Sequence, residues 1–277
     1  MRYSLCLSYD GAEFCGWQIQ PAAPSVQAAL ESTLSRLLNT PVQVTGAGRT
    51  DTLVNASGYI AHFDYPGELP FGQDDLCYKL NAMLPRSVAV HSVTPVPDDF
   101  HARFSARRRE YTYFIHRKKD PFVRAYSWQC GYPVLDFDAM NKACQYLHGT
   151  HDFTCFEKTG TDVKTSVCTI YDAFWKPYTP SYSEICHPDS LSHSDSFCHP
   201  DSFCHSERSE ESPYWYFRVS ADRFLRNMVR AIVGSLIEVG RGKQSPEWIA
   251  ELIAHGTRGD AGESVPGHAL FLSKVLY

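Results

Sequence analysis

Alternating hydrophobic and polar positions at the start of the chain predict a β-strand. In residues 2–9 (RYSLCLSY) two tyrosines and two leucines fall on one face and smaller or polar residues on the other, which is the period of a half-buried strand. Residues 25–39 instead repeat their apolar positions every three or four residues, as an amphipathic helix does. Ser25 stands just before these positions, where a helix N-cap is expected.

The rest of the chain mixes strands and helices without strict alternation. Further strands are predicted at residues 41–44, 58–64, 88–93, 109–115, 165–175, 214–220 and 268–277. Further helices are predicted at residues 74–84, 137–148, 222–240 and 246–256. This order favours an α+β fold over a doubly wound parallel sheet. A boundary near residue 105 gives two similar halves, residues 1–105 and 106–277, and we expect each to be a mainly antiparallel sheet with helices packed on one face.

The composition is that of an ordinary globular protein. Of the 277 residues 43% are hydrophobic, and a chain of this length can bury a real core. No apolar stretch approaches the ~20 residues that span a bilayer, and the start lacks the apolar run of about 7–15 residues of a signal peptide. The ten cysteines form no CxxC pair. We therefore expect a soluble, cytoplasmic protein with reduced thiols and no membrane partner.

Residues 181–213 differ in kind from the rest of the chain. They contain the near-repeat HPDSFCH and are dominated by Ser, His, Asp, Cys and Glu, too polar to offset the entropy lost on ordering. Three Cys-His dipeptides suit a zinc site, but the repetition alone explains their spacing. We interpret the segment as a low-complexity insertion that is dispensable for folding and catalysis, with a zinc-dependent interaction module as the alternative.

Charge is distributed unevenly, although the net charge is −5. Residues 183–213 hold seven acidic residues and one arginine, so the remainder carries +1. Within it, residues 103–124 hold eight basic residues against two acidic ones, interleaved with aromatic residues. This pattern suits a phosphate backbone with a stacked base and makes Arg107 and Arg108 candidate substrate-binding residues. A solvated strand edge remains the alternative.

Residues 46–51 (GAGRTD) form a small loop with two glycines and one carboxylate. The segment lacks the third glycine of a dinucleotide fingerprint and the GK[ST] of a phosphate loop, and its aspartate would repel a phosphate. The loop is better suited to presenting Asp51 to a substrate, because glycines let the backbone approach a ligand or adopt positive φ. Arg49 could pair with the carboxylate and keep it ionised. The alternative is a turn closed by a structural Arg–Asp pair.

A third candidate lies in residues 223–234 (RFLRNMVRAIVG). On a continuous helix Arg223, Asn227, Arg230 and Gly234 fall at i, i+4, i+7 and i+11, which makes one polar face. The glycine would permit close approach of another backbone. Asn227 and Arg230 are therefore candidate site residues.

These stretches, with YDGAEFCGWQIQP at residues 9–21 and FHARFSARRREYTYFI at residues 100–115, resemble the bacterial tRNA pseudouridine synthase A family. The resemblance covers most of residues 2–180 and 214–277, in order. It implies the pseudouridine synthase fold and an isomerase that converts uridine to pseudouridine at positions 38, 39 and 40 of the tRNA anticodon stem-loop. It also implies a homodimer that binds tRNA and not DNA in a basic cleft, without metal or organic cofactor.

Site residues follow from the resemblance motif by motif. Asp51 matches the catalytic aspartate and Arg49 its partner in base flipping. Tyr111 matches the tyrosine that packs on the target base, Arg230 the arginine that pairs with the aspartate, and Leu270 an apolar residue of the uracil pocket. The carboxylate could attack the sugar, attack the base or remove the C2′ proton, and the sequence does not separate these routes.

Three positions depart from the family pattern. Leu53 and Ala269 stand where glycine is usual, and Asn55 stands where histidine is usual. Two further interpretations therefore stay open beside the main one. One is a synthase of the same family with different target positions, and the other is a tRNA-binding homologue with impaired catalysis.

Overall fold

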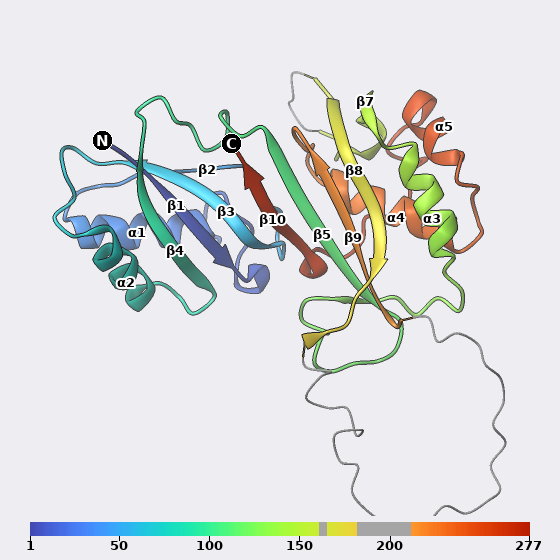
Figure 1. Cartoon of the computed structure of the whole chain (residues 1–277), viewed down its shortest axis with the longest axis horizontal. Coiled ribbons are helices and arrows are strands. Elements are labelled where there is room, and N and C mark those ends of the chain that lie inside the picture. The colour runs from blue at the N-terminus through green and yellow to red at the C-terminus, as the bar shows by residue number, and fades with distance from the viewer. Residues whose placement is uncertain (161–164, 182–211) are drawn as a thin grey trace, which may run out of the picture.

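The computed structural model describes residues 1–160, 165–181 and 212–277. The expectations about the insertion at 181–213, including its zinc alternative, therefore fall almost wholly outside the described residues. The described chain is α+β, and its strands form one large, mostly antiparallel sheet (Figure 1). None of its helices is long and apolar enough to cross a membrane.

Ten strands of the described chain make up this sheet. They are β1 (Arg2–Tyr9), β2 (Val44–Gly46), β3 (Asn55–Asp64), β4 (Val88–Val96), β5 (Arg108–His116), β6 (Trp128–Gln129), β7 (Gly149–Asp152), β8 (Val167–Pro177), β9 (Tyr214–Ala221) and β10 (Leu270–Leu276). The order is β4-β1-β3-β10-β5-β9-β8-β7, with β2 paired to β3 and β6 to β5. The last strand of the chain therefore lies in the middle of the sheet, parallel to β3 and antiparallel to β5.

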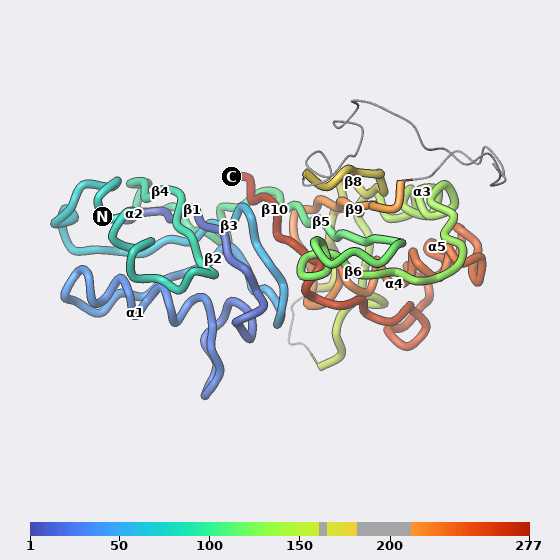
Figure 2. The backbone as a smooth tube through the Cα atoms, turned by 90° about the horizontal axis from the view of Figure 1, so that it is seen from below, coloured from blue at the N-terminus to red at the C-terminus, as the bar shows by residue number. Residues whose placement is uncertain are grey.

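The described residues form five α-helices, which pack beside this sheet in two groups (Figure 2). They are α1 (Val26–Leu38), α2 (Gln73–Met83), α3 (Phe137–Gln145), α4 (Met228–Gly240) and α5 (Trp248–His255). Helix α2 contacts β4 and α1 contacts β2, whereas α3 contacts β8 and α4. The predicted cap of α1 is confirmed, because the Ser25 hydroxyl accepts a hydrogen bond from the Ala28 N–H at 3.3 Å.

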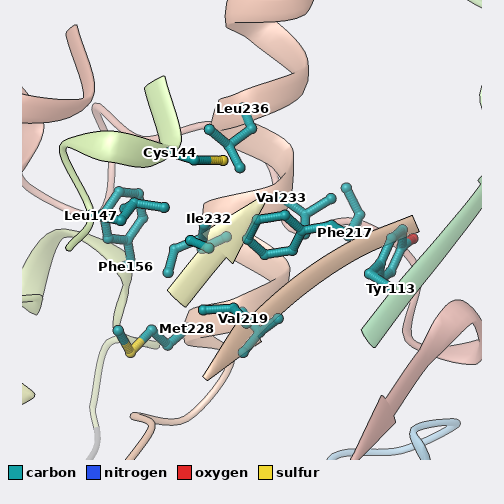
Figure 3. Packing of buried hydrophobic residues seen from close by; sticks show 14 of the residues in the cluster. Tyr113, Cys144, Leu147, Phe156, Phe217, Val219, Met228, Ile232, Val233 and Leu236 are labelled. Carbon is teal, nitrogen blue, oxygen red and sulfur yellow. The ribbon is translucent and has the colours of Figure 1, made fainter. Parts of the chain in front are cut away.

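The buried side chains form two hydrophobic clusters. One combines α1 and α2 with β1, β3 and β4, and the other surrounds α4 and the strands β5, β8 and β9 (Figure 3). Strand β10 contributes to both, with Leu270 in the second cluster and Leu272 in the first. The side chain of Tyr111 packs against both clusters. The junction of the two clusters is thus built around β5 and β10.

The helix predicted over residues 222–240 begins later than expected, at Met228. Asn227 adopts a left-handed conformation (φ 65°), which a continuous right-handed helix excludes. Arg223 and Asn227 therefore precede α4, and the predicted four-residue polar face was wrong for both. The close approach at Gly234 is confirmed, because a Cβ there would lie 1.8 Å from the Glu263 carbonyl oxygen.

Other boundaries shifted by smaller amounts. The strand predicted at residues 41–44 starts at Val44 and continues to Gly46, and the short strands β6 and β7 were not predicted. Strands β8 and β9 stay paired up to their ends: Pro177 faces Trp215, and the Tyr178 N–H donates to the Tyr214 carbonyl at 3.0 Å. The two described ends that flank the insertion therefore lie side by side.

Candidate active site

The loop between β2 and β3 holds Asp51 at the junction of the two clusters. Its backbone is fixed from several sides: the Trp17 N–H donates to the Thr50 carbonyl at 3.3 Å, and the Tyr59 hydroxyl donates to the Gly48 carbonyl. The Tyr9 hydroxyl lies 2.8 Å from the Thr50 Oγ1. The Asp51 side chain itself keeps 29% of its surface exposed. The loop thus presents a carboxylate from a rigid backbone to solvent.

The two glycines of this loop do not supply its unusual backbone. Neither is among the residues with positive φ in the described chain; Leu53 is, with φ 67°. Gly46 leaves room for an aromatic pair, because a Cβ there would lie 2.1 Å from the Tyr59 hydroxyl. That tyrosine stacks on Trp17 with ring centroids 4.2 Å apart. The loop therefore depends on the small size of Gly46 and on a left-handed turn at Leu53.

Arg109, which the sequence interpretation did not select, ties the loop to the rest of the site. Its guanidinium donates to the backbone carbonyls of Ala47 at 3.0 Å, Arg103 at 2.6 Å and Asp222 at 2.7 Å. Burial lowers its pKa, but an arginine stays charged in proteins. Because Arg107, Arg108 and Arg109 are consecutive arginines, the sequence alone does not indicate that Arg109 points inward.

Tyr111 lies on the same face of β5 as Arg109, since alternate residues of a strand share a face. Its ring meets the edge of Phe224 with centroids 5.0 Å apart. Burial raises the pKa of Tyr111 to about 12, the charge of Arg109 lowers it and the charge of Asp51 raises it. The phenol is therefore protonated at neutral pH and can donate a hydrogen bond close to Asp51.

The ion pair of Asp51 is made with Arg226, at 3.6 Å between Oδ1 and Nε. Within the described part of the chain no ion pair joins Asp51 to Arg49 or Arg230. The Arg230 Nε donates to the Val265 carbonyl at 2.6 Å, and Arg49 is exposed. Asn227 donates to the Ser264 hydroxyl at 2.5 Å, and Leu270 is buried in the second cluster. The roles expected for these four residues stay predictions.

A family profile described as tRNA pseudouridine synthase matches residues 5–105 and 143–277 of the chain. The chain belongs to the tRNA pseudouridine synthase family. It is 43% identical to tRNA pseudouridine synthase A of Parabacteroides distasonis over the whole chain and 96% of that protein. The same identity and coverage hold for the synthase A of Bacteroides fragilis, and 37% identity over 98% of the relative holds for that of an Exiguobacterium species.

Asn55 is built into this family member as a connector. Its buried side chain accepts a hydrogen bond from the Gly11 N–H at 2.8 Å and donates to the His268 carbonyl at 2.7 Å. It thereby joins the start of β3 to the turn after β1 and to the turn that precedes Leu270. The Asn55 side chain thus satisfies two backbone groups from distant segments, which gives it a structural role.

Arg107 and Arg108 occupy different surroundings. Arg108 pairs with Asp172, donates to the Ser220 hydroxyl at 2.6 Å and lies over the Tyr171 ring, 5.2 Å from its centroid. Because it is an odd number of positions from Tyr111, it lies on the opposite face of β5. Arg107 is exposed. The structure does not bring Arg108 to the synthase's carboxylate.

Metal ligands are not clustered in the described residues of this synthase. Across residues 1–160, 165–181 and 212–277, no group of three or more His, Cys, Asp or Glu side chains is placed to hold a metal ion.

Proposed function

We propose that this synthase converts uridine to pseudouridine at positions 38, 39 and 40 of the tRNA anticodon stem-loop, with Asp51 as the catalytic carboxylate. One observation carries the assignment of the residue. Asp51 is a partly exposed carboxylate on a fixed loop, next to an arginine and to a tyrosine that stays protonated. Membership in the family supplies the reaction class.

The reaction breaks the C1′–N1 bond of uridine, turns the uracil ring and joins C1′ to C5. The C5 hydrogen leaves as a proton and N1 gains one, so the conversion is an isomerisation and needs no redox cofactor. The nucleotide must first leave the base stack, at a cost of a few kcal/mol. Asp51 then acts on the sugar, on the base or on the C2′ proton, and each route needs the ionised carboxylate beside the nucleotide.

Tyr111 and Arg49 complete this assignment. A tyrosine ring offers a flat apolar surface on which the extruded uracil packs, and its protonated hydroxyl can donate to a carbonyl of the base. Arg49 is exposed beside Asp51 and can occupy the space that the extruded base leaves. Arg230 and Leu270 are proposed to border the uracil from α4 and β10.

The basic residues after residue 103 are proposed to bind the tRNA backbone. Exposed Arg107 suits this role, because each phosphate contact releases counterions and strengthens binding. Arg108 would have to release Asp172 to take part. Affinity for tRNA should therefore respond more strongly to Arg107→Glu than to Arg108→Glu, each measured against salt concentration.

We also propose that the protein acts as a homodimer. Four aromatic rings gather on the face of the sheet opposite Tyr113, at Phe114, Tyr178, Tyr216 and Phe271, with Phe114 between 5.2 and 6.3 Å from the other three. All four are only half-buried, and a second copy would cover them. Mass measurement in solution tests this: a dimer that Tyr216→Glu separates supports it, and a monomeric wild type contradicts it.

The organisation into two similar halves, residues 1–105 and 106–277, is part of the proposal and is supported by the two hydrophobic clusters. We propose the cytoplasm as the location, since the substrate is tRNA.

Single-nucleotide mapping of pseudouridine tests the proposed function. Purified protein is incubated, without added metal, with tRNAs that carry uridine at 38, 39 or 40 and with controls that carry cytidine there. Pseudouridine at these positions alone is the expected result. Modification elsewhere would mean a same-family synthase with other targets, and tight tRNA binding without modification would mean a homologue with impaired catalysis.

A further inference from the structure

The backbone of Arg226 is held in place, whereas its side chain is largely exposed and makes one loose contact. The Lys158 N–H donates to its carbonyl at 3.0 Å, and the next residue, Asn227, is held by Ser264. The preceding residue, Leu225, is buried. The side chain nevertheless keeps 54% of its surface exposed. The turn before α4 therefore aims a long cation at Asp51 without burying it.

The contact between Arg226 and Asp51 is loose. At 3.6 Å it is longer than a hydrogen bond between nitrogen and oxygen. A partly exposed pair of this kind contributes little to folding, so its partners exchange easily. Arg109 and Arg230 differ, because their guanidinium groups donate to backbone carbonyls at 2.6 to 3.0 Å. In the described part of the chain, no hydrogen bond anchors the Arg226 guanidinium.

The terminal nitrogens of the Arg226 guanidinium are available to bind a second anion. Nε is the atom nearest to Asp51, so the two terminal nitrogens and their four N–H groups are unused. A nucleotide of RNA brings a phosphate on each side of its sugar, and these phosphates repel a carboxylate that must approach the same nucleotide. A planar guanidinium between the two anions removes that repulsion, and its fork matches phosphate oxygens.

We propose that Arg226 is a substrate-positioning residue: its Nε stays beside Asp51 while its terminal nitrogens bind a phosphate that flanks the target uridine. The proposal rests on the proposed function, because it takes Asp51 to act on that nucleotide. It assigns the residue a task that neither Arg49 nor Arg230 performs, since it joins the catalytic carboxylate to the RNA backbone.

The test compares Arg226→Ala and Arg226→Lys with the wild type and with Arg36→Ala. Arg36 is a matched control, because it is an exposed arginine in the last turn of α1. The first turn of that helix is the end near the Asp51 loop, since the Gln27 N–H donates to the Trp17 carbonyl and the Trp17 N–H to the Thr50 carbonyl. For each protein, pseudouridine formation gives kcat/KM and a binding assay gives tRNA affinity, both over a series of salt concentrations. Thermal unfolding checks that each variant is folded.

Arg226→Ala should lower kcat/KM about 10- to 100-fold, as the loss of a charged hydrogen bond does. Its slope of log affinity against log salt should be shallower by about 1, because one phosphate contact is lost. Arg226→Lys should keep the slope but recover only part of kcat/KM, since an ammonium cannot span both anions. Arg36→Ala should match the wild type in both.

Unchanged salt slope and kcat/KM within about twofold for Arg226→Ala would overturn the proposal. So would lost turnover with an unchanged slope, because that pattern belongs to a purely structural residue. The binding series needs no turnover, so it tests the phosphate contact separately from the proposed function. If the wild type binds tRNA with a steeper salt slope than Arg226→Ala but forms no pseudouridine, the proposed function is contradicted and the phosphate contact is not.

Discussion

Replacing Leu53 by glycine and by alanine separates the strain of its backbone from the packing of its side chain. Its φ of 67° lies in the left-handed region, which costs a residue other than glycine about 1–2 kcal/mol. Both replacements remove the exposed side chain beyond Cβ, but only glycine relieves the strain. Glycine also loses more conformational entropy on folding than alanine, which offsets this gain by about 0.5–1 kcal/mol. Leu53→Gly should therefore be more stable than Leu53→Ala by about 0.5–1 kcal/mol.

The assay is thermal or urea unfolding of the two variants side by side. For a protein of this size the difference corresponds to about 1–3 °C in Tm. Ser32, exposed in the interior of α1, provides the matched control. There the order should reverse, with alanine more stable than glycine by about 1 kcal/mol, because the backbone is helical. An alanine at position 53 that equals or exceeds glycine in stability would refute the strain at Leu53.

Three other perturbations test the fold. Burial lowers the pKa of His62 to about 4, below its unfolded value near 6.5. Its contribution to the free energy of unfolding is therefore present above pH 6.5 and lost as the pH falls towards 4. His62→Asn should flatten the dependence of stability on pH over this range, and an unchanged dependence would contradict this. Gly234→Ala should cost about 1–3 kcal/mol in urea unfolding, because its Cβ would overlap the Glu263 carbonyl. Gly131→Ala, with open space around its Cβ, should cost little, and equal losses would refute the packing argument. Replacing residues 183–211 by a short Gly-Ser turn should leave Tm and turnover unchanged, since the flanking strand ends already pair; a large loss of either would show that the insertion contributes.

The local elements were readable from the sequence because local physics decides them. Strand β1 follows from alternation in residues 2–9, and α1 follows from its apolar period and the Ser25 cap. Asp51 could be selected because a carboxylate excluded the phosphate-binding interpretation of its loop. The motifs then supplied the family, which the profile match and the relatives show.

What the sequence did not reveal depends on contacts between distant segments. Nothing in residues 268–277 indicated that this strand pairs between β3 and β5. The helical spacing of residues 222–240 gave no sign of the turn at Asn227, whose side chain is held by Ser264. For the same reason the sequence did not indicate that Arg226 approaches Asp51. A run of arginines likewise gave no means of separating Arg109, which points inward, from Arg108, which pairs with Asp172.

The central claim, that Asp51 performs the isomerisation, is tested most directly by Asp51→Asn. The bond from C1′ to C5 replaces the C5 hydrogen, so tRNA labelled with tritium at C5 of its uridines releases tritium to water as pseudouridine forms. The account predicts that Asp51→Asn releases none above background while its affinity for tRNA stays close to that of the wild type, because affinity comes from phosphate contacts. Turnover within about tenfold of the wild type would contradict it, since removing a catalytic nucleophile or base costs far more.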